Sequence, residues 1–113
     1  MTIKIYHNPR CSKSRQTLAL LEEAGAKPAV IEYLKNPPDA EELRALLKKL
    51  NISAAELVRR KEAKDLGIDP DTLPEAALLE QMAANPVLVE RPIVITGKGA
   101  RICRPPEVVT EIL

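Results

Sequence analysis

Aromatic residues are scarce in this sequence. Phe and Trp are absent, Tyr occurs twice, and aromatics make up 2% of the 113 residues. The core must therefore be built from Leu, Ile, Val and Ala, which help to bring the hydrophobic share of the chain to 45%. A chain of this length can bury one hydrophobic core without disulfides. We therefore expect residues 1–113 to form a single compact domain.

Cysteine and net charge are also low. Cys11 and Cys103 are the only cysteines, too few for a disulfide-rich secreted scaffold, and we expect both to be reduced. Lys and Arg total 17 against 16 Asp and Glu, which excludes a chain-wide positive field for nucleic acids or anionic membranes. The N-terminal residues lack the apolar core of a signal peptide. No segment approaches the ~20 apolar residues of a membrane span, so we expect a soluble cytoplasmic protein.

The first third of the chain has the pattern strand, helix, strand. Thr2–Tyr6 alternates β-branched residues before the breaker pair Asn8-Pro9, which predicts a strand and a turn. Apolar residues at helical spacing predict a helix over Cys11–Ala24, and Gly25 follows where a left-handed cap is favoured. A second strand over Ala29–Leu34 would pair parallel to the first through a crossover helix.

The middle third indicates helices. Two acceptor residues are each followed three residues later by Glu, which is the spacing of a capping box. These pairs are Asp39 with Glu42 and Ser53 with Glu56. Helices should begin at both places, and Pro74–Ala84 has the pattern of a further one. We therefore expect a helical insertion at about residues 39–85.

The last third returns to strands. Pro92–Thr96, a glycine turn at 97–99 and Ala100–Arg104 predict a hairpin, after which Pro105 and Pro106 should open a terminal helix. The resulting order is βαβ, helices, ββα. It predicts an α/β fold with a thioredoxin-like sheet and a helical insertion between the two halves of that sheet.

Cys11 is the strongest candidate for chemistry. Its expected place is the N-terminus of a helix, where unpaired N–H groups and the helix dipole favour a thiolate. Arg10, Lys13 and Arg15 add positive charge, and no carboxylate occurs from residue 2 to residue 21. A buried structural cysteine is the ordinary alternative, but this position favours a reactive nucleophile.

Ser14 and His7 are candidates for supporting roles. Cys11 and Ser14 have the spacing of a Cys-x-x-Cys redox motif in which a hydroxyl replaces the second thiol. No local disulfide can form, so a covalent adduct at Cys11 would need an outside thiol to resolve it. His7, the only histidine, lies four residues before Cys11, where it could orient the loop or supply an electrostatic effect.

Three arginines and the second cysteine complete the set of candidates. Arg59, Arg91 and Arg104 lie in separate segments, and each could equally be a solvated charge. In a thioredoxin-like layout the loop before the third strand adjoins the active-site helix, so Arg91 would face Cys11. Guanidinium groups bind tetrahedral oxyanions in a bidentate manner. Cys103 fits a packed strand residue, with a resolving thiol as the alternative.

Four separated motifs stand out in the sequence: Ile-Tyr-His-Asn-Pro-Arg-Cys-Ser-Lys-Ser-Arg at 5–15, Asn-Pro-Pro at 36–38, Arg-Pro-Ile-Val at 91–94 and Arg-Ile-Cys-Arg-Pro at 101–105. Together they resemble the glutaredoxin-dependent arsenate reductase family. The resemblance runs nearly from end to end, in the same order and spacing. Ser12 and Arg10 occupy places where the best-known members have glycine and alanine, which indicates a side branch of the family.

The resemblance implies a mechanism and a set of partners. In that family a cysteine thiolate attacks arsenate, glutathione attacks the adduct, and glutaredoxin supplies electrons until arsenite leaves. The implied nucleophile is Cys11, with no bound cofactor or metal and with glutathione as co-substrate. The remaining matches are His7 and Ser14 as supporting residues, Arg59, Arg91 and Arg104 as oxyanion ligands, and Pro92 as the cis-proline of thioredoxin-like folds.

Two other functions are compatible with the same fold. Spx-type regulators resemble this chain but bind RNA polymerase and usually carry a Cys-x-x-Cys switch, so Ser14 and the three arginines favour the enzyme. The other alternative is a monothiol, glutathione-dependent disulfide reductase, in which the arginines would bind glutathione carboxylates.

Overall fold

The computed structural model describes residues 3–113, which divide into two compact units. The sheet unit runs from the N-terminal end to Asn36 and resumes from Arg91 to Leu113, and the helical unit comprises Pro37–Glu90. The expected insertion at about 39–85 lies within the helical unit. That the two units form one domain stays a prediction.

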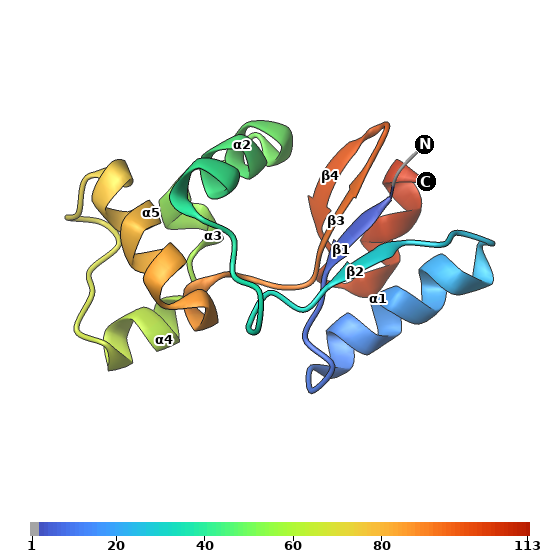
Figure 1. Ribbon diagram of the computed structural model, residues 1–113, viewed down its shortest axis with the longest axis horizontal. Helices are drawn as coiled ribbons and strands as arrows, with labels where there is room; N and C mark the ends of the chain where they lie inside the picture. Colours follow the sequence, from blue (N-terminus) through green and yellow to red (C-terminus); the bar gives the residue numbers. More distant parts are fainter. Residues whose placement is uncertain (1–2) are drawn as a thin grey trace. The chain divides into compact units, whose positions relative to one another are not determined.

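The sheet unit is built on four strands in the order β2-β1-β3-β4 (Figure 1). The strands are β1 (Lys4–Tyr6), β2 (Ala29–Ile31), β3 (Ile93–Thr96) and β4 (Gly99–Ile102). β2 pairs parallel to β1, whereas β3 pairs antiparallel to both β1 and β4. This mixed sheet confirms the α/β, thioredoxin-like arrangement predicted from the sequence. Thr2, included in the predicted first strand, lies outside the described residues.

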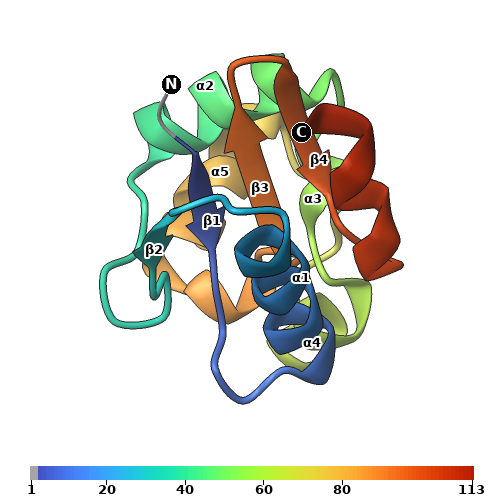
Figure 2. The same ribbon diagram turned by 90° about the vertical axis from the view of Figure 1, so that its right-hand side faces the viewer.

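Two helical segments pack together in the sheet unit. They are α1 (Ser12–Glu23) and the 3₁₀ helix η2 (Pro106–Ile112), which lie side by side (Figure 2). Their buried residues join strand residues in one apolar cluster of Ile5, Leu21, Val94, Cys103, Val109 and Ile112. Thr96 Oγ1 also donates a 2.6 Å hydrogen bond to the Ile112 carbonyl, which ties η2 to the hairpin.

The helical unit contains α2 (Ala40–Leu50), α3 (Ala54–Leu57), α4 (Arg60–Asp65), α5 (Glu75–Ala84) and the short 3₁₀ helix η1 (Pro86–Leu88). Both predicted capping boxes are present: Asp39 Oδ1 accepts from the Glu42 N–H at 2.8 Å, and Ser53 Oγ accepts from the Glu56 N–H at 3.3 Å. α5 contacts α2, α3 and η1, and Leu43, Leu57, Leu78, Leu79 and Met82 are fully buried.

Three details differ from the sequence-based expectation. The second strand ends at Ile31 rather than Leu34, because Lys35 and Asn36 donate hydrogen bonds back to the Glu32 carbonyl and close a turn. The helix after Ser53 is followed by a separate helix, α4 (Arg60–Asp65), which was not predicted from the sequence. The terminal helix is 3₁₀ rather than α. Its residues Val108, Val109, Thr110 and Ile112 are β-branched, so they give little preference for the α form.

Candidate active site

The loop between β1 and α1 places Cys11 at the start of the helix. Cys11 is the N-cap of α1 in an extended conformation (φ −92°, ψ 121°), as the sequence predicted. The Cys11 N–H donates to the Asn8 carbonyl at 3.0 Å, and the Cys11 carbonyl accepts from the Arg15 N–H at 3.0 Å. The Arg15 guanidinium donates to the Pro9 carbonyl at 2.8 Å. Main chain and side chain together therefore close the loop onto the first turn of α1.

The thiol of Cys11 is partly exposed, and its pKa lies below the ordinary value for cysteine. Partial burial raises the pKa, but four favourable effects outweigh it: the backbone N–H of Ser14, the charge of Arg91, the backbone N–H of Lys13 and the charge of Arg104. The Cys11 side chain makes no capping hydrogen bond in α1. The backbone N–H groups of Lys13 and Ser14 instead lower the pKa because they favour the negatively charged thiolate. The site therefore favours a nucleophilic sulfur.

Ser14 and His7 form a buried pair beneath the loop. Ser14 Oγ lies 2.5 Å from His7 Nδ1 and accepts a 3.0 Å hydrogen bond from the Asn8 N–H. Both side chains are buried, with 0% and 6% of their surface exposed. The Ser14 hydroxyl is therefore hydrogen-bonded to the loop and is not exposed to solvent.

His7 has a pKa below its ordinary value. Burial is the largest cause, Glu32 opposes it, and the positive charge of Arg15 adds to it. His7 is therefore neutral near neutral pH. Depending on the tautomer, Nδ1 either donates a hydrogen bond to Ser14 Oγ or accepts one from the Ser14 hydroxyl. The effect of Glu32 was not anticipated from the sequence, because only folding brings the end of β2 near the loop. His7 and Glu32 also line a cavity of about 370 Å³ with Asn8, Pro9, Arg10, Leu34 and Lys35.

Arg91 and Arg104 lie at the two ends of the β3–β4 hairpin. The Arg91–Pro92 peptide bond is cis, the geometry that the family resemblance implied at Pro92, and the Arg104–Pro105 bond is cis as well. Arg104 Nη1 donates to the Arg91 carbonyl at 3.2 Å, and the Nε and Nη1 atoms of Arg91 are buried. Both guanidinium groups lower the pKa of Cys11, so two of the three candidate arginines act on the candidate nucleophile.

Arg59 belongs to the helical unit. It is the N-cap residue of α4, and its guanidinium makes ion pairs with Glu62 (3.2 Å) and Glu90 (3.8 Å). Its role as an oxyanion ligand stays a prediction.

Cys103 lies in a different environment from Cys11. It is fully buried in the apolar cluster of the sheet unit, and burial raises the pKa of its thiol to about 12. Its Sγ donates a weak 3.7 Å hydrogen bond to the Arg101 carbonyl. These features correspond to a packed core residue rather than to a resolving thiol, although Cys103 lies just after β4 and not within it.

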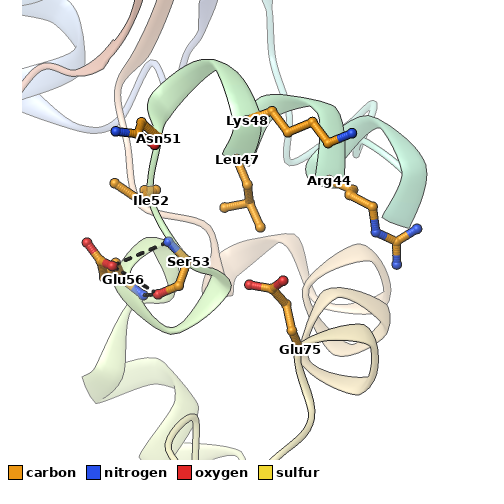
Figure 3. Close-up of a pocket in the computed structure, with 8 residues that line it drawn as sticks. All are labelled: Arg44, Leu47, Lys48, Asn51, Ile52, Ser53, Glu56 and Glu75. Carbon is orange, nitrogen blue, oxygen red and sulfur yellow. Dashed lines mark hydrogen bonds between the residues drawn. The ribbon is translucent and has the colours of Figure 1, made fainter.

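The helical unit has an open cavity of about 490 Å³ (Figure 3). Glu75 extends from α5, and its Oε1 accepts a 3.0 Å hydrogen bond from the Ala54 N–H, which supports α3. The other lining residues are Arg44, Leu47, Lys48, Asn51, Ile52, Ser53 and Glu56, which include neither a cysteine nor a histidine. Within residues 3–113 there is no cluster of three metal-ligating side chains, and no helix there is long and apolar enough to cross a membrane.

The fold and the site define a thioredoxin-like protein with one activated cysteine. Residues 6–112 match the ArsC family, and the chain belongs to that family.

Relatives support this assignment over the whole length. The chain is 55% identical to the uncharacterized protein YfgD of Escherichia coli strain K12, covering 98% of this chain and 96% of that one. It is 46% identical to the arsenate reductase of Haemophilus influenzae strain Rd, covering 100% of both. The solved structure of an arsenate reductase from Vibrio cholerae superposes with a TM-score of 0.89 at 46% identity, covering 100% of this chain and 98% of that one.

Proposed function

We propose that this protein reduces arsenate to arsenite, with Cys11 as the nucleophile. The observation that carries the proposal is the lowered pKa of Cys11 together with two arginines that act on its thiol. An attacking anion must approach an anionic substrate, so local cations are needed to offset the repulsion. Family membership supports the same chemistry, because relatives that are 42–46% identical are named arsenate reductases.

The first step forms a sulfur–arsenic bond. The Cys11 thiolate attacks arsenic(V), and one arsenate oxygen leaves as water after protonation. Arg91 and Arg104 stabilise the oxyanion through charge-assisted hydrogen bonds, and Arg59 is the proposed third ligand. His7 and Ser14 hold the loop so that the backbone N–H groups of α1 stay directed at the sulfur.

The electrons come from two external thiols, because Ser14 replaces a second local thiol and Cys103 is buried. Glutathione attacks the arsenic of the Cys11 adduct and displaces a second oxygen as water. A glutaredoxin thiolate then attacks the glutathione sulfur, so the bond between that sulfur and arsenic breaks, its electron pair stays on arsenic, and a mixed disulfide forms. Two thiols are oxidised to one disulfide while arsenic(V) becomes arsenic(III). Water then releases arsenite and restores the Cys11 thiolate. No metal and no bound cofactor take part in this scheme.

The test is arsenite release by the pure protein supplied with arsenate, glutathione, glutaredoxin and a system that regenerates reduced glutathione. We expect arsenite to form in proportion to enzyme, and to stop when either thiol component is omitted. A protein that reduces small glutathione mixed disulfides but releases no arsenite would instead be a monothiol disulfide reductase. Binding of the RNA polymerase α subunit without any turnover would identify a regulator.

A further inference from the structure

The Arg59 guanidinium carries two carboxylate partners. We propose that Glu62 and Glu90 are positioning residues, whose carboxylates hold the Arg59 guanidinium and compete with the oxyanion for it. The inference rests on the proposed function, in which Arg59 binds oxyanion. Neither glutamate has a role in the steps proposed above.

The distances and burial support this pairing. Arg59 Nη1 lies 3.2 Å from Glu62 Oε1, and Arg59 Nε lies 3.8 Å from Glu90 Oε1. The three side chains are only 24%, 21% and 28% exposed. Solvent therefore screens these ion pairs less than it screens a pair on the open surface, where the contribution of such a pair is small.

The backbone holds the same residues together. The Arg59 N–H donates to the Leu88 carbonyl at 2.7 Å, and the Glu90 N–H donates to the Leu57 carbonyl at 3.0 Å. Between these bonds, Val58 and Val89 form an antiparallel bridge. Glu62 follows Arg59 by three residues, in the first turn of α4. The two carboxylates thus reach Arg59 from two segments that are fixed to each other.

The two contacts use the donors that an oxyanion needs. A guanidinium binds a carboxylate or a tetrahedral oxyanion through a fork of neighbouring N–H groups. The ion pairs of Arg59 lie on its Nε and on one terminal nitrogen. Each bidentate fork of the guanidinium, Nε with Nη2 or Nη1 with Nη2, therefore shares one nitrogen with a carboxylate, so a bidentate oxyanion competes with that carboxylate and binds close to its negative charge. The two glutamates keep Arg59 ordered in the free protein at the expense of affinity for the oxyanion.

The experiment measures binding without turnover. In a Cys11→Ser background, arsenate affinity is measured by calorimetry for Glu62→Gln, for Glu90→Gln and for both together, since Gln keeps the shape of Glu but removes its charge. Glu80→Gln, on an exposed position of α5, is the matched control. We expect each of the first two variants to bind arsenate about three- to tenfold more tightly, and Glu80→Gln to bind as the background does.

A double-mutant cycle with Arg59→Ala shows whether the effect passes through Arg59. We expect the gain from each glutamate variant to vanish when Arg59 is absent. Unchanged or weaker binding in both variants would overturn the inference, as would a gain that persists without Arg59. If Arg59→Ala alone bound arsenate as tightly as the background, Arg59 would lose its proposed role and the inference would fall with it. Failure of the proposed function itself would appear separately, as no arsenite from the wild-type protein. If Glu62→Gln weakens α4 and the variant fails to fold, Glu90→Gln alone decides.

Discussion

The two cysteines of this protein lie in opposite environments within one folded unit. Cys11 is part-exposed at the N-terminus of α1, and its thiol pKa is lowered by backbone N–H groups and two arginines against the effect of burial. Cys103 is packed among apolar side chains, and its thiol pKa is raised to about 12 by burial. The surroundings thus favour the thiolate at one position and the neutral thiol at the other, so we expect reactivity to follow from position in the fold.

The sharpest way to break this comparison is to remove each thiol in turn. We expect Cys11→Ser to abolish arsenite release, because serine is far too weak a nucleophile to replace a thiolate at this site. A folded Cys103→Ser variant should keep turnover within about twofold, since glutathione is the thiol proposed to resolve the adduct. Initial rates of arsenite formation check both variants. Equal and complete loss in two well-folded variants would make Cys103 an internal resolving thiol.

The next largest effect is in chemical reactivity. At pH 7.5 we expect Cys11 to be alkylated by iodoacetamide about a thousandfold or more faster than Cys103, because a thiol with a pKa near 12 has almost no thiolate at that pH. Quantitative mass spectrometry of the two peptides measures both rates against pH. In denaturant the rates should converge, with midpoints near the ~8.5 of a free thiol. Similar rates in the folded protein would contradict the assignment of the nucleophile.

Arginine substitutions sharpen the Cys11 side of the comparison. Truncating one bidentate guanidinium should cost about 2 to 4 kcal/mol in the transition state, so Arg59→Ala, Arg91→Ala and Arg104→Ala should each lower kcat/KM roughly 30- to 1000-fold. Arg91→Lys and Arg104→Lys should also be poor, because lysine keeps the charge but loses the planar fork.

The arginine variants separate stabilisation of the Cys11 thiolate from binding of the oxyanion. Arg91→Ala and Arg104→Ala should also move the alkylation midpoint of Cys11 upward, because both arginines stabilise its thiolate. Reduction of a small neutral disulfide should change much less in all three alanine variants. Arsenate turnover within about twofold of wild type in all three would mean that these arginines are surface charges.

A smaller effect should follow from the hydroxyl beneath the loop. Ser14→Ala leaves His7 Nδ1 and the Asn8 N–H without their buried partner, which should cost about 1 to 3 kcal/mol of stability and lower kcat/KM roughly three- to thirtyfold. Thr17→Val is the matched control, since the Thr17 hydroxyl is also buried in α1 but bonds only to the Lys13 carbonyl. Chemical denaturation and steady-state kinetics measure both. Equal activity losses in the two variants would argue against a specific role for Ser14.

The effect with the smallest change per pH unit is a pH dependence of stability on the Cys103 side. Above about pH 8.5 the unfolded chain loses the Cys103 proton, whereas the folded protein keeps it until about pH 12. The folded state then binds more protons, so the stability of wild type should fall by up to about 1.4 kcal/mol per pH unit from this residue. Cys103→Ala should be less stable overall but show a shallower decline between pH 8.5 and 10.5. Urea unfolding across that range compares the slopes, and equal slopes would mean that Cys103 ionises freely in the folded protein.

Local patterns allowed most of the elements, and the place of Cys11, to be predicted. These patterns depend only on neighbouring residues, so sequence alone reveals them. They are the strand before Pro9, the capping acceptors Asp39 and Ser53, and Gly25, which has a φ of 81°. The separate helix α4 was not predicted, because the extended conformation of Val58 before it depends on a bridge to Val89, a distant residue.

The candidate site could be predicted only in part for the same reason. Cys11 and Ser14 belong to one local motif, whereas Arg91 and Arg104 are distant in sequence, and the fold is what makes them act on one thiol. The spacing of these residues in the sequence also gave no sign that the Ser14 hydroxyl is hydrogen-bonded to His7. Glu90, one of the two carboxylate partners of Arg59, likewise reaches it through the pairing of segments 57–59 and 88–90, whereas Glu62 is a local partner in α4.

In the proposed mechanism, the hydroxyl at Ser14 and the burial of the Cys103 thiol together determine how long the covalent intermediate on Cys11 lasts. The chain has two cysteines, and the second is enclosed in the core, so no thiol of its own can attack an adduct on Cys11. The lifetime of that adduct is then inversely proportional to the concentration of external thiol. When that concentration falls, the protein accumulates in the adduct form, so the adduct fraction in intact mass spectra reports the supply of reduced thiol around it.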